Sequence, residues 1–141
     1  EVEGTSMPSP NDRLYSKEHE WLKQEGELAY IGITEYAQEQ LGDVVYVDLP
    51  EVGSQVIQYE KMGEIESVKA VSELYAPASG EVVMVNDEVV QKPELVNTDP
   101  LEAGWLLQIK LTRTLELNGL MSAQDYDDFT ATESKDEAVG P

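Results

Sequence analysis

Short runs of alternating apolar and polar residues cover most of the chain, and glycine or proline residues separate them. Alternation with a period of two is typical of strands that bury one face. Short turns between such strands favour antiparallel pairing. The pattern therefore predicts a mainly β fold, a flattened antiparallel barrel or sandwich with a few short helices. The expected strands are 20–24, 28–33, 43–49, 56–59, 62–68, 71–75, 80–86 and 105–111.

Two segments carry helix signals instead. Thr34 can cap the first turn of a helix at 34–42, and Gly42 can end it. Residues 122–129 predict a C-terminal helix, because Ser122 is a favoured N-cap residue and acidic residues follow in the first turn. Residues 87–95 are ambiguous because Pro93 interrupts them, and a turn or short helix is expected around 93–95. Residues 97–100 are expected to be a loop.

The chain of 141 residues is expected to form one domain, residues 13–129. Residues 1–12 are expected to be a flexible N-terminus, frayed at 8–12, and residues 1–6 are interpreted as the remnant of an expression tag because they precede Met7. Residues 130–141 are polar and acidic, and they predict a flexible tail.

One predicted hairpin has a lysine at its tip. The strand before Lys69 and the strand after it each carry an acidic residue close to the lysine, Glu66 and Glu73. The plain interpretation is a solvated lysine in a turn, because lysine is mostly exposed. A nucleophilic lysine needs burial or a neighbouring cation, and here the neighbours are carboxylates. Lys69 is therefore better suited to carry a prosthetic group, which the hairpin would hold at its root.

Charge and composition exclude several functions. Nine basic against 29 acidic residues give a net charge of −20, which argues against nucleic acid and against an anionic membrane surface as partners. The charge favours either partners met through acidic patches or solubility alone. No apolar run is long enough to span a membrane.

The chain has no cysteine and one histidine, His19. Disulfides, thiolate metal sites, iron–sulfur clusters, thiol catalysis and a multi-histidine metal site are therefore excluded. No phosphate-binding or dinucleotide-binding glycine motif occurs. The residues alone leave three hypotheses open: a carrier modified at Lys69, a small acid–base enzyme that uses His19 with Glu18 or Glu20, and an acidic interaction module.

The hairpin carries the sequence Glu66-Ser67-Val68-Lys69-Ala70, and Ala76-Pro77-Ala78-Ser79-Gly80-Glu81-Val82 follows it. Together these residues resemble the lipoylation site of the glycine cleavage system H proteins. Val68-Lys69-Ala70 differs from the Asp-Lys-Ala typical of the lipoyl domains of 2-oxo-acid dehydrogenases and from the Met-Lys-Met of biotin carriers. Further blocks are similar to the same family in the same order, so the resemblance extends over nearly the whole expected domain. The similar blocks are 16–21, 32–38, 41–50, 66–70, 76–82, 97–100 and 104–106.

This resemblance implies a barrel-sandwich hybrid fold of the lipoyl and biotinyl carrier type over residues 13–129. It implies lipoate covalently attached to Lys69 by a lipoate-attaching enzyme. It also implies a non-catalytic carrier that moves the aminomethyl group of glycine between the P protein (glycine decarboxylase), the T protein (aminomethyltransferase) and the L protein (dihydrolipoyl dehydrogenase). The expected location is the bacterial cytoplasm, with the mitochondrial matrix as the alternative.

The resemblance also assigns residues. Glu20, with His19 and Glu73, is expected to shelter the loaded arm, because a carboxylate can hold the protonated amine by a charge-assisted hydrogen bond. Glu66 and Gly80 are expected to be read by the lipoate-attaching enzyme. Their plain interpretations are a solvated carboxylate and a turn glycine that needs positive φ. No catalytic residue and no metal ligand is expected.

Overall fold

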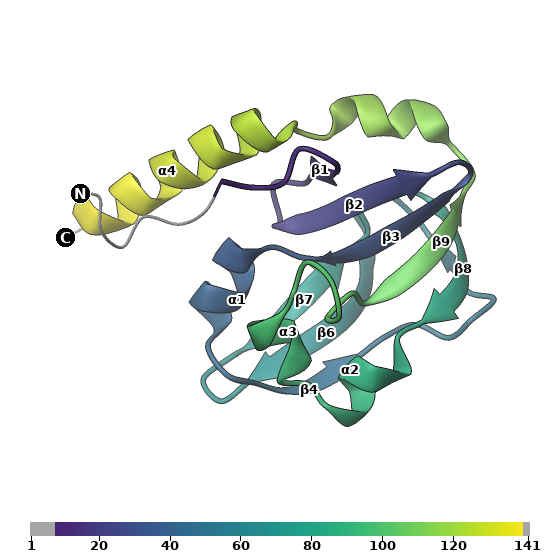
Figure 1. The fold of residues 1–141 in the computed structure, drawn as a ribbon, viewed down its shortest axis with the longest axis horizontal. Helices are drawn as coiled ribbons and strands as arrows, with labels where there is room; N and C mark the ends of the chain where they lie inside the picture. Colours follow the sequence, from purple (N-terminus) through teal and green to yellow (C-terminus); the bar gives the residue numbers. More distant parts are fainter. Residues whose placement is uncertain (1–7, 140–141) are drawn as a thin grey trace.

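The computed structural model describes the backbone of residues 8–139 and the side chains as far as Glu133. This part of the chain forms a six-stranded sheet in the order β1-β2-β3-β9-β8-β5 and a three-stranded sheet in the order β4-β6-β7 (Figure 1). The elements are β1 (Leu14–Tyr15), β2 (Glu20–Glu25), β3 (Leu28–Ile33), α1 (Glu35–Leu41), β4 (Val44–Asp48), β5 (Gln55–Val56), β6 (Lys61–Ser67), β7 (Val71–Tyr75), β8 (Gly80–Val85), α2 (Asp87–Gln91), α3 (Leu95–Thr98), β9 (Leu107–Leu111), the 3-10 helix η1 (Thr114–Gly119) and α4 (Ala123–Val139).

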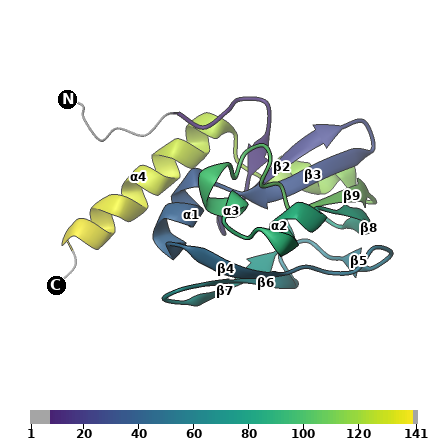
Figure 2. The same ribbon diagram turned by 60° about the horizontal axis from the view of Figure 1, so that its bottom comes forward.

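Every strand pair is antiparallel, and the predicted fold class is confirmed. The two sheets face each other, and α1, α2 and α3 lie at one side of them (Figure 2). The core lies between the sheets. Ile31 and Ile109 of the larger sheet and Val47 and Ile65 of the smaller one belong to the same buried cluster. Burial of this apolar surface is the main force that holds the two sheets together.

The predicted helix after β3 is confirmed together with both of its ends. The Thr34 hydroxyl accepts a hydrogen bond from the Ala37 N–H, which satisfies one of the free donors of the first turn. Gly42 ends the helix with a φ of 78°, in the left-handed region that favours glycine. The hairpins 20–33 and 62–75 are confirmed as the pairs β2-β3 and β6-β7.

Several predicted boundaries are wrong. The strand predicted at 56–59 ends at Val56, because the chain turns at Tyr59, which has a φ of 70°. Part of the predicted loop 97–100 is helical, since α3 extends to Thr98. The ambiguous segment after β8 contains α2, and the Asn86 side chain caps it by accepting a hydrogen bond from the Glu88 N–H.

The two ends of the described chain also differ from the prediction. Pro8 to Asp12 was expected to be frayed, but the Ser9 backbone N–H and hydroxyl both donate to the Asp127 carboxylate. The predicted eight-residue helix at 122–129 continues to Val139, into the segment predicted as a flexible tail. This continuation includes the strong helix formers alanine, glutamate and lysine, which favour a longer helix than the one predicted. The flexibility of residues 130–141 stays a prediction. The tag remnant assigned to residues 1–6 lies outside the described residues.

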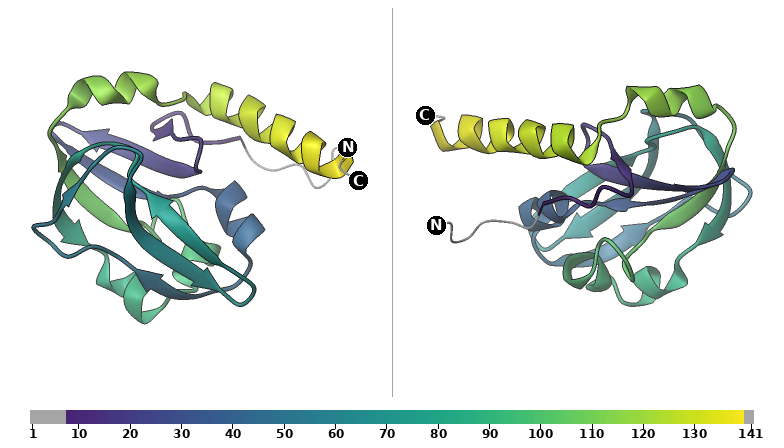
Figure 3. Two further views of the ribbon diagram at one scale, coloured as in Figure 1. Left: turned by 180° about the vertical axis from the view of Figure 1, so that it is seen from behind. Right: turned by 45° about the horizontal axis from the view of Figure 1, so that its top comes forward.

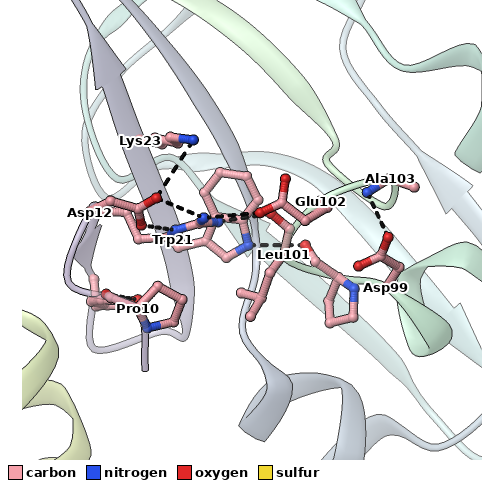
Figure 4. A network of polar contacts seen from close by, with 11 residues as sticks. Pro10, Asp12, Trp21, Lys23, Asp99, Leu101, Glu102 and Ala103 are labelled. Atoms are coloured by element: carbon pink, nitrogen blue, oxygen red, sulfur yellow. Dashed lines mark hydrogen bonds and ion pairs between the residues drawn. The ribbon is translucent and has the colours of Figure 1, made fainter. Parts of the chain in front are cut away.

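Trp21 joins strand β2 to the loop before β9 (Figure 4). The Trp21 indole N–H donates to the Pro100 carbonyl over 3.1 Å, and the Arg13 guanidinium lies 4.6 Å from the Trp21 ring centre. Arg13 also donates to the Leu101 carbonyl over 2.9 Å. The Trp21 ring lies over the Cα of Gly32 on the paired strand, where a Cβ would be 2.5 Å from the nearest ring carbon.

We therefore predict that Gly32→Ala lowers the free energy of unfolding by about 1 to 3 kcal/mol, since overpacking displaces the indole. Urea denaturation measures the change. In a Trp21→Leu background, which lacks the clashing ring atoms, the same substitution should cost clearly less. An equal cost in both backgrounds would contradict this explanation.

Candidate functional site

Lys69 lies at the tip of the β6-β7 hairpin, and its side chain is exposed. Ser67 fixes this tip. Its backbone N–H donates to the Ala70 carbonyl over 2.8 Å, and its hydroxyl oxygen accepts from the N–H groups of Lys69 and Ala70. The backbone N–H groups of Ser67, Lys69 and Ala70 are thus satisfied within the turn, which makes it a stiff base for a side chain.

The link between α1 and β4 supports the tip from one side. The Val68 N–H donates to the Asp43 carbonyl over 2.9 Å. The Lys69 stem lies over Gly42, where a Cβ would be 3.4 Å from the lysine Cε. The stem of Lys69 thus lies beside the C-terminal end of α1, close to Gly42.

A cleft of about 380 Å³ opens beside this tip. The start of β2, helix α1, the β6-β7 hairpin and helix α4 contribute to it, and the left view of Figure 3 shows the hairpin next to α1. Apolar side chains form much of its wall, including Ile33, Leu41 and Ile65. The lining residues are Glu18, His19, Glu20, Ile33, Tyr36, Ala37, Gln40, Leu41, Ile65, Ala70, Val71, Ser72, Glu73, Leu74 and Glu133.

The charge of this cleft has one sign. Four of its lining residues are glutamates, Glu18, Glu20, Glu73 and Glu133, and none of the described lining residues is lysine or arginine. Close carboxylates create a negative potential that is screened least where water has least access. An apolar wall with acidic groups suits a ligand that has an apolar stem and a cationic end.

Glu20 is the buried member of this group, with 1% of its surface exposed. One carboxylate oxygen accepts from the Ser16 hydroxyl over 2.5 Å, and the other accepts from the Tyr75 N–H over 3.0 Å. Burial raises the pKa of Glu20 to about 7, although these two hydrogen bonds lower it. Glu20 thereby joins the start of β2 to the end of β7 across the cleft.

His19 lies between Glu18 and Glu20 in the chain, but its two ring nitrogens contact residues of helix α4 instead. Nδ1 lies 2.8 Å from the Tyr126 hydroxyl, and Nε2 lies 3.3 Å from Glu133 Oε1. Burial lowers the pKa of His19, while Glu133 and Glu18 oppose this shift. The structure therefore gives His19 partners on α4 and records no bond to Glu18 or Glu20, the partners of the hypothetical acid–base enzyme.

The remaining predicted site residues lie in different places. Glu73 lines the cleft, and its carboxylate accepts from the Tyr75 hydroxyl over 2.6 Å. Glu66 is exposed between Tyr46 and Val71 in the smaller sheet and does not line the cleft.

Gly80 is buried at the start of β8, and a Cβ there would lie 2.4 Å from the Lys110 carbonyl oxygen. Its place in the strand corrects the interpretation as a turn glycine with positive φ, because the requirement is close approach to β9. The structure does not bring Gly80 into the cleft.

A model of the glycine cleavage H-protein family matches residues 13–133. The chain belongs to this family. The resemblance inferred from the motifs is thereby confirmed. Glycine cleavage system H proteins of Symbiobacterium thermophilum and Brevibacillus brevis are 54% and 53% identical to the chain over 121 residues, which is 86% of this chain and 94% and 96% of theirs.

The fold agrees with that of a solved relative. The crystal structure of a glycine cleavage system H protein from Mycobacterium marinum matches with a TM-score of 0.82 and 42% identity, over 87% of this chain and 99% of that chain. In the part of the chain described here, no helix is long and apolar enough to cross a membrane. The described histidine, aspartate and glutamate side chains form no group of three that could hold a metal ion.

Asn97 fixes the link between α1 and β4 that supports the tip of the Lys69 hairpin, although it does not line the cleft. Its side-chain N–H₂ donates to the Gly42 carbonyl over 2.8 Å, and its side-chain oxygen accepts from the Val44 N–H over 2.8 Å. These bonds fix the link that supports the tip of the Lys69 hairpin. The sequence offers no signal for them beyond the similarity of 97–100 to the family, because the partners lie far apart in the chain.

The raised pKa of Glu20 predicts a pH dependence of stability. The folded protein holds the proton up to about pH 7, whereas the ordinary value is 4.5, so stability is lost as pH rises through this window. Between about pH 5 and pH 8, the protein should lose about 2 to 3 kcal/mol more than a Glu20→Gln variant does. Urea unfolding at both values measures this, and an equal loss in the two proteins would contradict the burial argument.

Proposed function

We propose that this H protein is the lipoyl carrier of the glycine cleavage system, with lipoate joined by an amide bond to Nζ of Lys69. One observation carries the proposal: an exposed lysine on a stiff hairpin tip stands next to a cleft that is apolar in its wall and acidic in its charged groups. The tip fixes the root of an arm, and the cleft is close enough to receive its end.

The residues present fit such an arm. Lys69 is open to an attaching enzyme, and its stem lies beside the C-terminal end of α1. Ile33, Leu41 and Ile65 offer an apolar surface to a hydrocarbon chain. An extended lysyl-lipoyl arm measures about 14 Å from summed bond lengths, which lets one carrier reach the active sites of several partners.

Lipoate supplies a dithiolane that accepts the aminomethyl group left when glycine is decarboxylated. The cargo carries a primary amine, which is protonated near neutral pH. The carboxylates of Glu18, Glu73 and Glu133 attract this ammonium, joined by Glu20 as pH rises past about 7, and they have no such attraction for an uncharged arm. The cleft therefore shelters the loaded arm and releases the unloaded one, and burial keeps water from the bond that would hydrolyse.

Glu20, His19 and Glu73 form part of this shelter in our proposal. Each carboxylate oxygen of Glu20 has a lone pair left after its bond to Ser16 or Tyr75, which the ammonium can use from inside the cleft. Glu66 faces outward beside Lys69 and is available to the lipoate-attaching enzyme. In our proposal Gly80 acts on that enzyme indirectly, because it allows the close approach of β8 to β9.

The partners in this proposal are the P, T and L proteins and the lipoate-attaching enzyme. The chain itself holds and hides the cargo, and the partners perform the chemistry. Bacterial relatives favour the cytoplasm as the place of action, and the mitochondrial matrix is the alternative for a processed protein. Turnover by the isolated protein without partners would favour an enzyme instead.

The attachment is tested by intact mass after expression with an active lipoate ligase. The protein should gain one lipoyl group, and Lys69→Arg, which keeps the charge, should gain none. Lys61→Arg, on the same hairpin, serves as the matched control and should be modified like the unaltered protein. An unmodified protein, or a modified Lys69→Arg variant, would sink the proposal.

The shelter predicts slower loss of cargo while Glu20 is charged. At about pH 8, Glu20→Gln should release formaldehyde and ammonia from the loaded carrier roughly tenfold faster, since a hydrogen bond to a charged group contributes about 1.5 to 3 kcal/mol. Glu25→Gln, at the exposed end of the same strand, makes the same charge change away from the cleft. Equal rates in the two variants would move the role to another carboxylate.

A further inference from the structure

Helix α4 presents one face to the rest of the protein. Tyr126, Phe129 and Glu133 follow one another at spacings of three and four residues, which places them on the same side of a helix. Tyr126 is 2% exposed, and its ring stacks on Tyr15 with ring centres 4.8 Å apart. The helix is thus anchored at its first turns, and this anchored face leads to Glu133, which lines the cleft.

His19 connects this face to the cleft. Its ring lies between the aromatic side chains of both helices, with ring centres 4.8 Å from Tyr36 on α1 and 5.9 Å from Phe129 on α4. Nδ1 faces Tyr126 and Nε2 faces Glu133. The right view of Figure 3 shows α4 extending past the sheets.

The hydrogen bonds decide which ring nitrogen of a neutral His19 holds its proton. The Thr34 oxygen already accepts the Ala37 N–H, and the Thr34 and Tyr126 hydroxyl oxygens lie 2.7 Å apart. If Thr34 donates to Tyr126 and Tyr126 donates to Nδ1, the His19 proton is on Nε2 and faces the Glu133 carboxylate. In the opposite order, Nδ1–H donates to Tyr126, and the lone pair of Nε2 faces a carboxylate oxygen 3.3 Å away. These two groups repel each other, so the first order is favoured.

The backbone of His19 is unusual for a residue with a side chain. Its φ is 74°, in the left-handed region, where a residue other than glycine is uncommon. Two backbone hydrogen bonds hold it there, from the His19 N–H to the Ser16 carbonyl and from the Thr34 N–H to the His19 carbonyl, each over 3.1 Å. Such strain persists only where the surroundings fix it, and here it aims the ring at α4 rather than into the core.

We propose that Glu133 binds the ammonium of the loaded arm, so that helix α4 is a functional wall of the shelter. This inference rests on the proposed carrier function and adds a residue to it. Glu133 is better placed than Glu20 to meet an incoming cation, because its side chain is 38% exposed whereas Glu20 is 1% exposed. Among the described residues, the Glu133 carboxylate has a polar contact with the His19 ring alone, whereas both carboxylate oxygens of Glu20 accept hydrogen bonds.

The contact of Glu133 with His19 then has a definite consequence. When the ammonium arrives, the Glu133 carboxylate is shared between the cation and the Nε2–H of His19. The field at the imidazole changes although the arm does not touch it. Since His19 is the single histidine of the 141 residues, its proton and carbon NMR signals report this change without ambiguity.

The experiment uses full-length, lipoylated protein whose reduced arm is loaded with formaldehyde and ammonium, a reaction that forms the aminomethyl thioether and one water. Glu133→Gln is compared with Asp128→Asn, an exposed residue of the same helix that makes the same charge change outside the cleft. Two quantities are measured: the His19 Cε1–H signal before and after loading, and the rate of formaldehyde release.

Loading should shift the His19 signal in the unaltered protein and in Asp128→Asn, and the shift should disappear in Glu133→Gln. Release should be at least threefold faster in Glu133→Gln, and Glu133→Asp, which keeps the charge, should restore part of the protection. The inference is overturned if Glu133→Gln keeps both the shift and the slow release while its mass shows a loaded Lys69. An unmodified Lys69 in the unaltered protein would overturn the carrier proposal itself, and the mass spectrum separates these outcomes.

Discussion

The root of the Lys69 side chain is held by short-range hydrogen bonds of the hairpin tip, and the proposed arm depends on them. Ser67 binds the N–H groups of Lys69 and Ala70, and Val68 binds the Asp43 carbonyl. A flexible tip would let the arm sweep through solvent, and the nearby cleft would then bind it with a large loss of conformational entropy. A fixed root removes part of that loss, so a modest attraction inside the cleft is enough to hold the arm's end.

We attribute that attraction to electrostatics. The glutamates that produce it come from distant parts of the chain. Glu18 comes from the turn before β2, Glu20 from the start of β2, Glu73 from β7 and Glu133 from α4. Burial raises the pKa of Glu20, and repulsion by the nearby Glu18 adds a smaller contribution in the same direction. A cationic cargo relieves this repulsion, which gives the loaded arm a preference for the cleft that an uncharged arm lacks.

Local patterns in the sequence predicted the local structure well. The β6-β7 hairpin with Lys69 at its tip follows from alternation, and the ends of α1 follow from Thr34 and Gly42. Membership of the family followed from short blocks of residues in the right order. These features depend on neighbours in the sequence, which single-sequence reasoning can assess.

The contacts that shape the site could not be predicted in this way. The Glu20–Tyr75 and Asn97–Gly42 hydrogen bonds each join residues 55 positions apart, and no periodicity encodes them. The polar residues around Glu133 predict a tail rather than part of a site. In the structure, Tyr126 of the same helix is buried, and Glu133 lines the cleft. Only the assembled fold shows that the C-terminal helix belongs to the site.

The most direct measurement compares the hydrolysis of the same aminomethyl thioether on the carrier and on free dihydrolipoamide. We predict that the carrier-bound group releases formaldehyde at least tenfold more slowly at low salt, and that added salt makes the two rates more similar by screening the carboxylates. Equal rates on the carrier and on the free compound would contradict the proposal that the cleft beside Lys69 shelters a cationic cargo.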